Sequence, residues 1–511
     1  MRKRERVLEV ASVLGELLAG EARLRWQRGR NGLADPEDYE RERARAIRHT
    51  LEHLGPLYIK VGQVLSTRPD LVSQTVIDAL QDLHEQVMVR PFAEFEPVLE
   101  KNLGFHWRYR FTEIDTDVPL GAASIAQVYR AVQTDGQEVV LKVQRPGVTA
   151  ATRLDMEILA QAVKLAMKRA PTISEIFQPE AMLEVVFSAM RPEIDFTVEA
   201  SNMEEFREML EDFEHLRVPD VLDVTKEVLI MSKAPGVSIR EMDVDAFTPK
   251  ERELIGRDMC SMLFHGFMVE GLFHADPHPG NIFVAPGEPA TVIDFGMVGR
   301  IDRRMALGYT RFMMATALND GEAAGRAALE MGTLTSLANI AGFLSDMQRY
   351  IPTMANQTLQ NMEFGNDFNQ FLVFCTNRGI AVNPAIALFG KATANLEGSL
   401  RRLAPELTPF DVFRDSMGDI IRDQAKQLVA QEELLRIANE AFFASRSIPE
   451  QLRYLAQAVV NGQYVLRIRD DSAVIHEARE DKRAKAMRRT LIGIAGAALW
   501  LDHRRRRPPA R

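Results

Sequence analysis

Two aspartates and one asparagine stand at fixed offsets in one short stretch, residues 273–299. Asp276 comes first, Asn281 follows five positions later, and Asp294 opens an Asp-Phe-Gly tripeptide. The amide oxygen of Asn281 and the carboxylate of Asp294 suit a hard divalent cation, which takes oxygen ligands and bridges phosphates. Asp276 is then left to orient or deprotonate a hydroxyl group or a water molecule. The stretch predicts phosphate chemistry, and the alternative is an ordinary loop and hairpin whose acids face water.

The segment between Asn281 and Asp294 predicts a β-hairpin. Two β-type runs, residues 282–284 and 291–293, flank a Pro-Gly-Glu-Pro sequence that is typical of a turn. Because a hairpin folds the chain back on itself, we expect it to bring Asp294 close to Asn281.

A β-ribbon is predicted before this stretch, with strands at residues 111–114, 125–131 and 138–143. Lys142 stands inside the last of these apolar strands, where an ammonium group costs free energy unless it is paired. We expect Lys142 to hold phosphates and to pair with a helix glutamate. The alternative is a lysine whose tip reaches the surface. The small-residue loop at 119–124 could let backbone N–H groups approach a phosphate.

The acids that could pair with Lys142 lie in a helical region, residues 150–215. Pro192 can open a helix there, which would place Glu193, Asp195 and Glu199 in its first turns. Glu199 is the expected partner of Lys142. Acids at a helix start are also ordinary dipole and capping chemistry, so spacing alone leaves both interpretations open.

The remaining elements frame these groups. Residues 1–110 are expected to be mostly helical, and Lys60 and Gln63 lie there beside an apolar stripe, where spacing alone predicts surface residues. A strand at 228–231 ends in an Ala-Pro-Gly-Val sequence that is a plausible hinge between two lobes. Residues 301–470 are expected to be almost wholly helical.

Composition limits the class of protein. The 511 residues suffice for two to four compact units or one large domain with extensions, and 46% hydrophobic with 26% charged residues is globular. The two cysteines, Cys260 and Cys375, give no disulfide framework and fit a reducing compartment. Acids at Glu5, Glu9 and Glu16 interrupt the apolar N-terminal positions, which favours an amphipathic helix over a secretory signal.

The net charge of −9 is unevenly distributed along the chain. Residues 482–511 hold ten Lys or Arg residues and one acid, Asp502, so this tail carries +9 and the rest carries −18. A strongly acidic body argues against nucleic acid as the main partner. The tail also contains an eleven-residue apolar run, 491–501, which rises only ~16 Å as a helix and cannot span a bilayer alone. It could lie in an anionic membrane surface, pack on the body or form an oligomer contact.

Together these residues resemble the UbiB/AarF family of atypical, protein-kinase-like kinases, which is tied to ubiquinone biosynthesis, from about Arg4 to about residue 470. Several motifs carry the resemblance. Lys60-Val61-Gly62-Gln63 is similar to the K-x-G-Q signature, Gly121-Ala122-Ala123-Ser124 to the alanine-rich loop, Lys142 to the strand lysine, Glu193 and Asp195 to the E-x-D motif, Glu199 to the helix glutamate, Asp276 and Asn281 to the catalytic loop, and Asp294 to the metal-binding aspartate.

The resemblance implies a two-lobed, predominantly α, α+β fold of the protein-kinase type. Its implied parts are an N-terminal helical extension (1–110), an antiparallel β N-lobe with a helical insertion (111–235), a helical C-lobe (236–470) and a basic tail (471–511).

The resemblance also implies roles for the site residues, with ATP or ADP and Mg²⁺ as cofactors. In the family the K-x-G-Q helix covers the active site and its lysine meets the E-x-D acids. The implied catalytic residues are Asp276, Lys142 and Glu199; the metal ligands are Asn281 and Asp294; the nucleotide-binding residues are Gly121, Ala122, Ala123, Ser124, Val128, Lys142 and Met231; and the occluding residues are Lys60, Gln63, Glu193 and Asp195.

The implied function is an atypical kinase or ATPase that supports ubiquinone or related lipid biosynthesis by ATP hydrolysis or small-molecule phosphorylation. The alternatives are a catalytically weak nucleotide-binding scaffold and a protein kinase. Implied partners are ATP, an anionic membrane surface, quinone precursor lipids and biosynthetic proteins, with a location in the cytoplasm or on the inner face of its membrane. The sequence departs from the family at Gly121, where many members have Ala or Ser, at Ser232, where a hinge acid is common in kinases, and in its tail, which lacks two full membrane spans.

Overall fold

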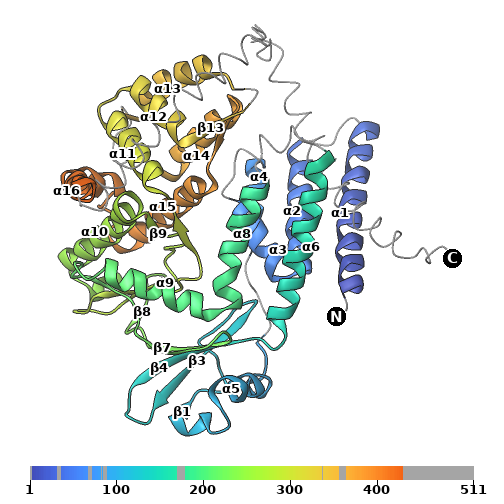
Figure 1. Ribbon diagram of the computed structural model, residues 1–511, viewed down its shortest axis with the longest axis vertical. Helices are drawn as coiled ribbons and strands as arrows, with labels where there is room; N and C mark the ends of the chain where they lie inside the picture. The colour runs from blue at the N-terminus through green and yellow to red at the C-terminus, as the bar shows by residue number, and fades with distance from the viewer. Residues whose placement is uncertain are drawn as a thin grey trace, which may run out of the picture. The chain divides into compact units, whose positions relative to one another are not determined.

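The computed structural model describes residues 3–31, 36–66, 72–81, 83, 89–169, 179–335, 338–355 and 364–429 (Figure 1). The chain divides into two compact units, Met1–Phe413 with Arg489–Arg511, and Arg414–Arg488. Of the second unit only the end of helix α16 (Pro409–Val429) is described. The basic tail, its apolar run and the expected boundary at residue 470 lie outside the described residues.

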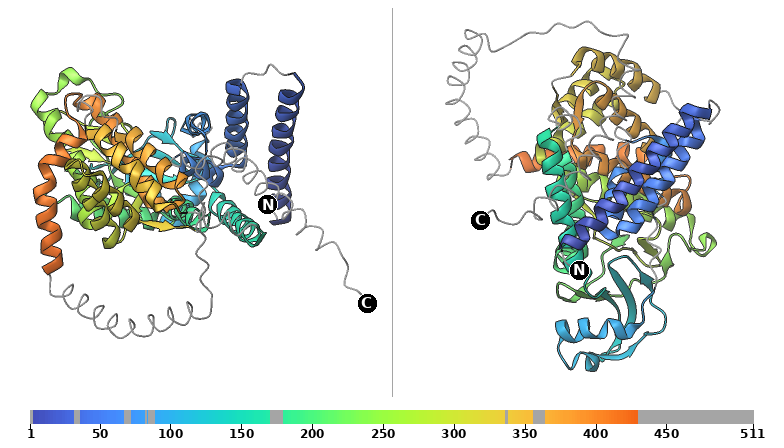
Figure 2. Two further views of the ribbon diagram at one scale, coloured as in Figure 1. Left: turned by 90° about the horizontal axis from the view of Figure 1, so that it is seen from above. Right: turned by 90° about the vertical axis from the view of Figure 1, so that its right-hand side faces the viewer.

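Four helices make up most of the described residues up to Gln81, and the first two run side by side (Figure 2). A buried ion pair fixes the first helix, because Arg6 Nε and Nη2 each lie 2.7 Å from a carboxylate oxygen of Asp155. Arg6 Nη2 also donates to the carbonyl of Leu54, which directly precedes Gly55 and the third helix. Gly55 has a φ of 101°, a conformation that favours glycine. The helices are α1 (Lys3–Asn31), α2 (Pro36–Leu54), α3 (Pro56–Leu65) and α4 (Gln74–Gln81).

A six-stranded antiparallel sheet follows, in the order β1-β3-β4-β7-β6 with β2 paired to β3. Val139, Leu141 and Val143 alternate along β4 and pack in the core that α5 (Glu96–Leu103) covers. Because side chains alternate between the two faces of a strand, Lys142 points to the opposite face. The strands are β1 (Phe111–Ile114), β2 (Gly121–Ala122), β3 (Ala126–Gln133), β4 (Glu138–Gln144), β6 (Val221–Val224) and β7 (Val228–Ser232).

Pro192 does not open a helix, and that prediction is wrong. It lies inside α8 (Pro179–Ile194), which follows α6 (Val148–Arg169). The next helix, α9 (Phe196–Met209), starts after Asp195, whose carboxylate accepts a hydrogen bond from the Thr197 N–H at 3.2 Å. An aspartate with an extended backbone is a favourable N-cap, so Asp195 rather than Pro192 sets the boundary.

The C-terminal part of the first unit is mainly helical, with short strands at the site. It contains α10 (Pro249–His265), α11 (Arg303–Ala317), α12 (Gly321–Met331), α13 (Ile340–Ala355), α14 (Phe364–Asn377) and α15 (Pro384–Leu403). One small sheet has the order β5-β11-β10-β8, with β5 (Leu216–Arg217), β8 (Val237–Ser238), β10 (Ile282–Val284) and β11 (Ala290–Val292). A second pairs β9 (Leu272–His274) with β12 (Val298–Arg300).

The expectation that residues 301–470 are almost wholly helical needs one correction in the described part. β13 (Gly332–Leu334) and β14 (Ile380–Val382) form an antiparallel pair. All three residues of β14 are buried, and its β-branched Ile380 and Val382 suit a strand. Burial in the folded protein therefore decides the conformation of β14, because three residues are too few to show the alternation of a strand in the sequence.

Aromatic side chains pack α15 against the segment that precedes Asp276. The Phe389 ring of α15 lies 3.8 Å from the Phe267 ring and 5.4 Å from the Phe273 ring, between ring centroids. Phe273 belongs to β9, the strand before Asp276, so this cluster sets the distance between α15 and the loop that follows β9.

Replacing Gly62 by alanine is expected to destabilise the N-terminal helices by about 1–3 kcal/mol through overpacking. A Cβ at Gly62 would lie 2.3 Å from Leu83 Cδ1 and 2.9 Å from Leu51 Cδ1. Gly121→Ala is the matched control, because a Cβ at Gly121 meets no atom within 4 Å. Thermal unfolding compares the two variants, and an unchanged melting temperature for Gly62→Ala would contradict the close packing of α3 against Leu51 and Leu83.

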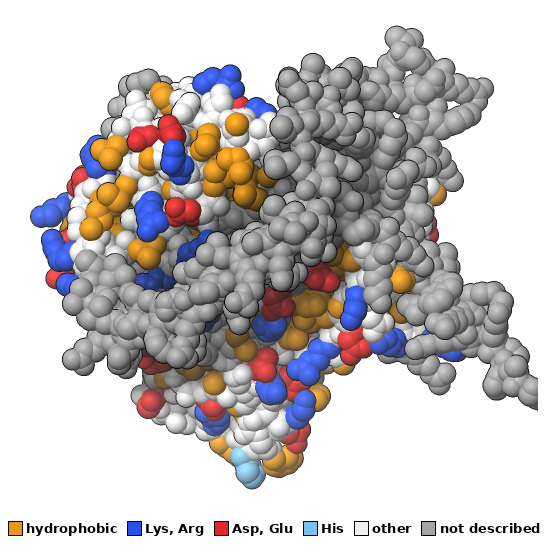
Figure 3. Space-filling model, turned by 45° about the horizontal axis from the view of Figure 1, so that its top comes forward, with side chains coloured by type: hydrophobic (Ala, Val, Ile, Leu, Met, Phe, Trp, Pro, Cys, Tyr) orange, Lys and Arg blue, Asp and Glu red, His pale blue; other side chains and the backbone are white. Residues whose placement is uncertain are grey.

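On the face drawn in Figure 3, acidic and basic side chains are interspersed over the described residues. Exposed ion pairs of the described residues include Arg300–Glu205 and Arg311–Glu330. Each such pair contributes at most about 1 kcal/mol. None of the described helices combines the length and the apolar character needed to cross a membrane.

Candidate active site

His274 joins the two halves of the site. It is fully buried, and its Nδ1 accepts a hydrogen bond from the backbone N–H of Asp276 at 3.1 Å. Its Nε2 lies 3.3 Å from the carbonyl oxygen of Ile293, the residue before Asp294. Burial lowers the pKa of His274, so the imidazole is neutral and its Nε2–H donates to Ile293. One side chain thereby fixes the backbone that carries Asp276 against the backbone that carries Asp294.

The Asp276 carboxylate is held through one of its two oxygens. Asn395 Nδ2 donates to Oδ1 at 2.5 Å, and Lys391 Nζ lies 3.4 Å from the same atom. Burial opposes its charge, but Lys391 and His278 outweigh burial and keep the pKa of Asp276 below its usual range. No donor among the described residues contacts Oδ2, so that oxygen can accept a proton from a hydroxyl group or a water molecule.

Asn281 and Asp294 flank the predicted hairpin, which β10 and β11 form with Ile282 opposite Val292. The N–H of Ile293 donates to the Asn281 carbonyl at 2.9 Å. The Asn281 Nδ2 donates to the Asp276 carbonyl at 3.1 Å, which turns the Asn281 amide oxygen away from that contact. Asp294 has a φ of 62°, a left-handed conformation that aspartate tolerates better than most residues, and it is open to solvent.

Two lysines influence the charge of Asp294. Partial desolvation opposes the charge of its carboxylate, but the ammonium groups of Lys142 and Lys60 outweigh that cost and hold its pKa below the usual range. Asp294 therefore stays an anion at neutral pH, as a metal ligand must.

Lys142 and Glu199 form a buried bidentate pair. Lys142 Nζ lies 2.7 Å from Glu199 Oε1 and 2.8 Å from Oε2, and Glu199 is 2% exposed. Burial disfavours the ammonium ion, yet the carboxylates of Glu199, Asp294 and Glu193 prevail and raise the pKa of Lys142 above its usual value. The ammonium group of Lys142 therefore stays charged at neutral pH and is fixed in place.

Helix α3 contacts these charged residues through Lys60, which is 7% exposed and donates to Glu193 Oε1 at 2.9 Å. A Cβ on Gly296 would lie 3.9 Å from the same Glu193 oxygen, so the pair sits beside the Asp-Phe-Gly tripeptide. Gln63 Oε1 is buried without a hydrogen-bond partner among the described residues. Asp195, in contrast, caps α9 and lies 3.7 Å from Lys226 Nζ.

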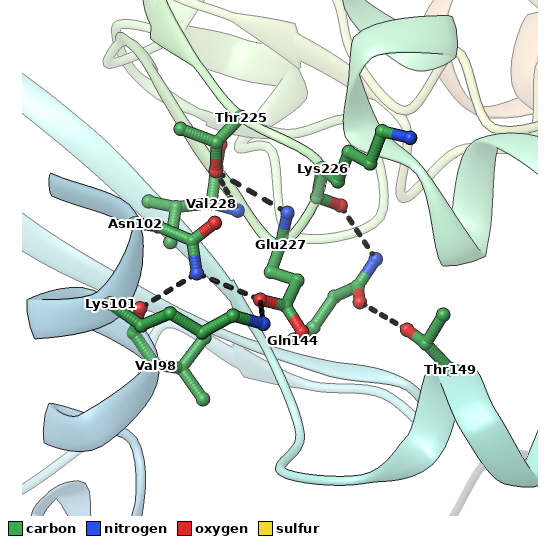
Figure 4. A network of polar contacts seen from close by, with 9 residues as sticks. All are labelled: Val98, Lys101, Asn102, Gln144, Thr149, Thr225, Lys226, Glu227 and Val228. Atoms are coloured by element: carbon green, nitrogen blue, oxygen red, sulfur yellow. Dashed lines mark hydrogen bonds and ion pairs between the residues drawn. The ribbon is translucent and has the colours of Figure 1, made fainter.

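Gln144 lies in a hydrogen-bond network that Figure 4 shows with Lys226 and Thr149, and the same side chain also binds the backbone of Glu193. Gln144 Nε2 donates to the carbonyls of Glu193 and Lys226 at 2.9 and 3.0 Å, while its amide oxygen accepts from Thr149 Oγ1. The carbonyl of Lys226 also accepts from the N–H of Phe196, the first residue of α9. One buried amide at the end of β4 thus positions both Glu193 and the helix that carries Glu199.

The predicted nucleotide-binding residues lie along the sheet. Gly121 and Ala122 form edge strand β2, where Gly121 pairs with Val128, and the Ala123 N–H donates to the Ala126 carbonyl. Val128 in turn pairs with Lys142, and Met231 with Val140 on the other side of β4. Lys142, Val128 and β2 therefore follow one another across three neighbouring strands.

The sequence interpretation missed five residues that complete the site. Lys391 and Asn395 contact Asp276 from α15, His274 joins the two loops, and Asn202 Nδ2 donates to the Phe295 carbonyl at 3.0 Å. Ser399 Oγ also donates to the Pro277 carbonyl at 2.9 Å. Polar residues at positions 391, 395 and 399 share one face of a helix, which was the available signal.

The donor set fits Mg²⁺ bound together with a nucleotide. In the described part of the chain, no three His, Cys, Asp or Glu residues form a group that could hold a metal alone. Asn281 and Asp294 would supply two oxygen ligands, and Mg²⁺ commonly takes the rest from phosphates and water. The orphaned Gln63 oxygen is a further acceptor that a bound nucleotide with its hydration shell could satisfy.

Comparisons with known proteins agree with this geometry. Residues 82–328 match the ABC1 atypical kinase-like domain. The chain is 27% identical to the probable protein kinase UbiB of Marinobacter nauticus, over 74% of this chain and 70% of that protein. It is 25% identical to an uncharacterized Clostridium pasteurianum protein encoded in the 5' region of hydrogenase 1, over 83% of this chain and 80% of that one.

A solved structure is also similar, that of a Mycobacterium tuberculosis protein in complex with erythromycin. It shares 23% identity over 69% of this chain and 93% of its own, with a TM-score of 0.42. The expected two-lobed, kinase-like α+β class is confirmed, with an antiparallel sheet followed by a helical lobe. The resemblance to the UbiB/AarF family is likewise confirmed, because residues 82–328 match the ABC1 atypical kinase-like domain and several similar proteins are named UbiB.

Proposed function

We propose that the chain is a Mg²⁺-dependent ATPase or small-molecule kinase that supports the biosynthesis of ubiquinone or a related polyprenyl lipid. The observation that carries the proposal is that His274 joins the backbone of Asp276 to the backbone before Asp294, in the same structure as the buried Lys142–Glu199 pair. Several relatives bear the name UbiB, which motivates the quinone pathway.

In this proposal each residue has one task. Lys142, oriented by Glu199, holds the phosphates of ATP, and the Gly121–Ser124 segment and Met231 border the nucleotide. Mg²⁺ held by Asn281 and Asp294 would neutralise phosphate charge. Asp276 orients the attacking oxygen and accepts its proton through Oδ2.

The position of α3 favours a small acceptor. The Lys60–Glu193 contact joins α3 to α8 beside Gly296, and apolar side chains of α3 such as Leu57 and Val64 pack with Met190 of α8. A peptide would need to displace this packing in order to reach Asp276. Phosphorylation of a peptide library by the purified chain would favour instead the protein-kinase activity after which several relatives are named.

Quinone profiling of cells in which Asp294→Asn replaces the native residue tests the pathway. We expect the polyprenyl quinone to fall and a precursor to accumulate, as in a strain without the protein. Asp302→Asn serves as the control, because Asp302 caps α11 and asparagine caps equally well. A normal quinone profile in Asp294→Asn cells with normal protein levels would remove quinone biosynthesis from the proposal.

A further inference from the structure

Lys391 is a partly buried lysine to which none of the sequence motifs assigns a role. Its side chain is 21% exposed, and its ammonium group lies 3.4 Å from Asp276 Oδ1. Unlike Lys142 and Lys60, which each donate to a carboxylate at 2.7–2.9 Å, Lys391 donates no hydrogen bond within the described part of the chain. Its three N–H donors are therefore available to a ligand at the oxygen that accepts the phosphoryl group.

The helix that carries Lys391 is fixed independently of the lysine. Asn395 and Ser399, one and two turns further along α15, hydrogen-bond to Asp276 and to the Pro277 carbonyl. Phe389 packs against Phe267 and Phe273. Since these contacts already hold α15 against the loop, structural anchoring does not require a lysine at 391.

The cations are distributed around the two aspartates in a definite way. Lys142 and Lys60 lower the pKa of Asp294, the proposed metal ligand. Lys391 lowers the pKa of Asp276, which is proposed to bind the acceptor. A phosphoryl group that moves from ATP to an acceptor oxygen held by Asp276 moves away from Lys142 and Lys60 and approaches Lys391. Charge on its non-bridging oxygens in the transition state would otherwise lie near the Asp276 anion without compensation.

We propose that Lys391 is a catalytic residue whose ammonium group binds a non-bridging oxygen of the phosphoryl group during transfer. The proposal rests on the function proposed above. In the step, a bond forms between the acceptor oxygen and the γ-phosphorus while the bond from that phosphorus to the β–γ bridging oxygen breaks. The acceptor proton goes to Asp276 Oδ2, ADP leaves, and Lys391 stays protonated throughout.

The experiment compares Lys391→Met, Lys391→Arg and Arg401→Met in the full-length protein. Arg401 is an exposed cation of the same helix, so its variant is the matched control. Binding of fluorescent ADP and of ADP with Mg²⁺ and aluminium fluoride, a mimic of the transferring phosphoryl group, is measured together with phosphate release from Mg-ATP.

We expect Lys391→Met to keep ADP affinity within about twofold, to bind the aluminium fluoride complex at least tenfold more weakly, and to lose about 10²-fold in kcat. Lys391→Arg should recover part of the loss, and Arg401→Met should match the wild type. The acidic limb of the pH profile should also move to higher pH in Lys391→Met, because the carboxylate of Asp276 loses a stabilising cation. Equal losses for ADP and for the aluminium fluoride complex, or an unchanged kcat, would overturn the role of Lys391. Absence of turnover in the wild type would instead count against the proposed function. Binding of ADP with Mg²⁺ and aluminium fluoride would still test whether Lys391 contacts the transferring group.

Discussion

Asp294→Asn is expected to lower the rate of Mg-ATP turnover by about 10³-fold, roughly 4 kcal/mol in the activation free energy. The change removes the one charged oxygen ligand of the proposed metal site, and the carbonyl oxygen of asparagine is a weaker ligand for a hard cation. It also removes one negative charge near Lys142 and Lys60, which remain paired with Glu199 and Glu193. Asparagine tolerates the left-handed conformation that Asp294 adopts at φ 62°, so the backbone of the hairpin should persist.

The measurement is phosphate release from Mg-ATP over a range of Mg²⁺ concentrations, with thermal unfolding as a check on the fold. Asp302→Asn again controls for the loss of one carboxylate, since its side chain only accepts from the Met305 N–H. Turnover by Asp294→Asn within tenfold of the wild type, with an unchanged dependence on Mg²⁺, would show that Asp294 is not the metal ligand.

The parts of the site that lie close in sequence could be predicted from the sequence. Asn281 and Asp294 are joined by a hairpin whose turn chemistry is local, and the open end of the hairpin brings them together, since the Ile293 N–H donates to the Asn281 carbonyl. The strands at 111–114, 138–144 and 228–232 begin at the predicted residues for the same reason, since a period of two needs only a few residues to be visible.

Contacts between segments that are distant in the sequence could not be predicted as well. Spacing alone placed Lys60 on the surface, yet it is 7% exposed and pairs with Glu193, 133 positions away. Asn395 reaches Asp276 across 119 positions. A helical period identifies the face on which such a residue lies but not the element that the face meets, so the partner emerges only from tertiary packing. For Lys60 the family motif supplied what the period could not.

Lys142→Met is expected to destabilise the protein by about 3–5 kcal/mol at neutral pH and to make its stability depend on pH. The change leaves Glu199, which is 2% exposed, without its counter-charge. Burial raises the pKa of Glu199 to about 7, while Lys142 acts in the opposite direction, so the pKa of Glu199 should rise further in the variant. A carboxyl group whose pKa is higher in the folded protein than in the unfolded chain stabilises the fold at low pH and loses that contribution as the pH rises.

Urea unfolding of wild type and Lys142→Met at about pH 5 and pH 8 measures this dependence, because the folded variant gives up the Glu199 proton only at a higher pH than the unfolded chain does. The stability gap to the wild type should widen from the first pH to the second. Removing both charges in Lys142→Met/Glu199→Leu should recover most of the loss and abolish the widening, because an apolar pair leaves no buried ion. A gap that is the same at both pH values, or a double variant no more stable than the single one, would mean that the pair is not desolvated enough to be strongly coupled. Lys142 would then be held for phosphate binding by its surroundings as a whole, with Asp294 and Glu193 sharing the role assigned to Glu199.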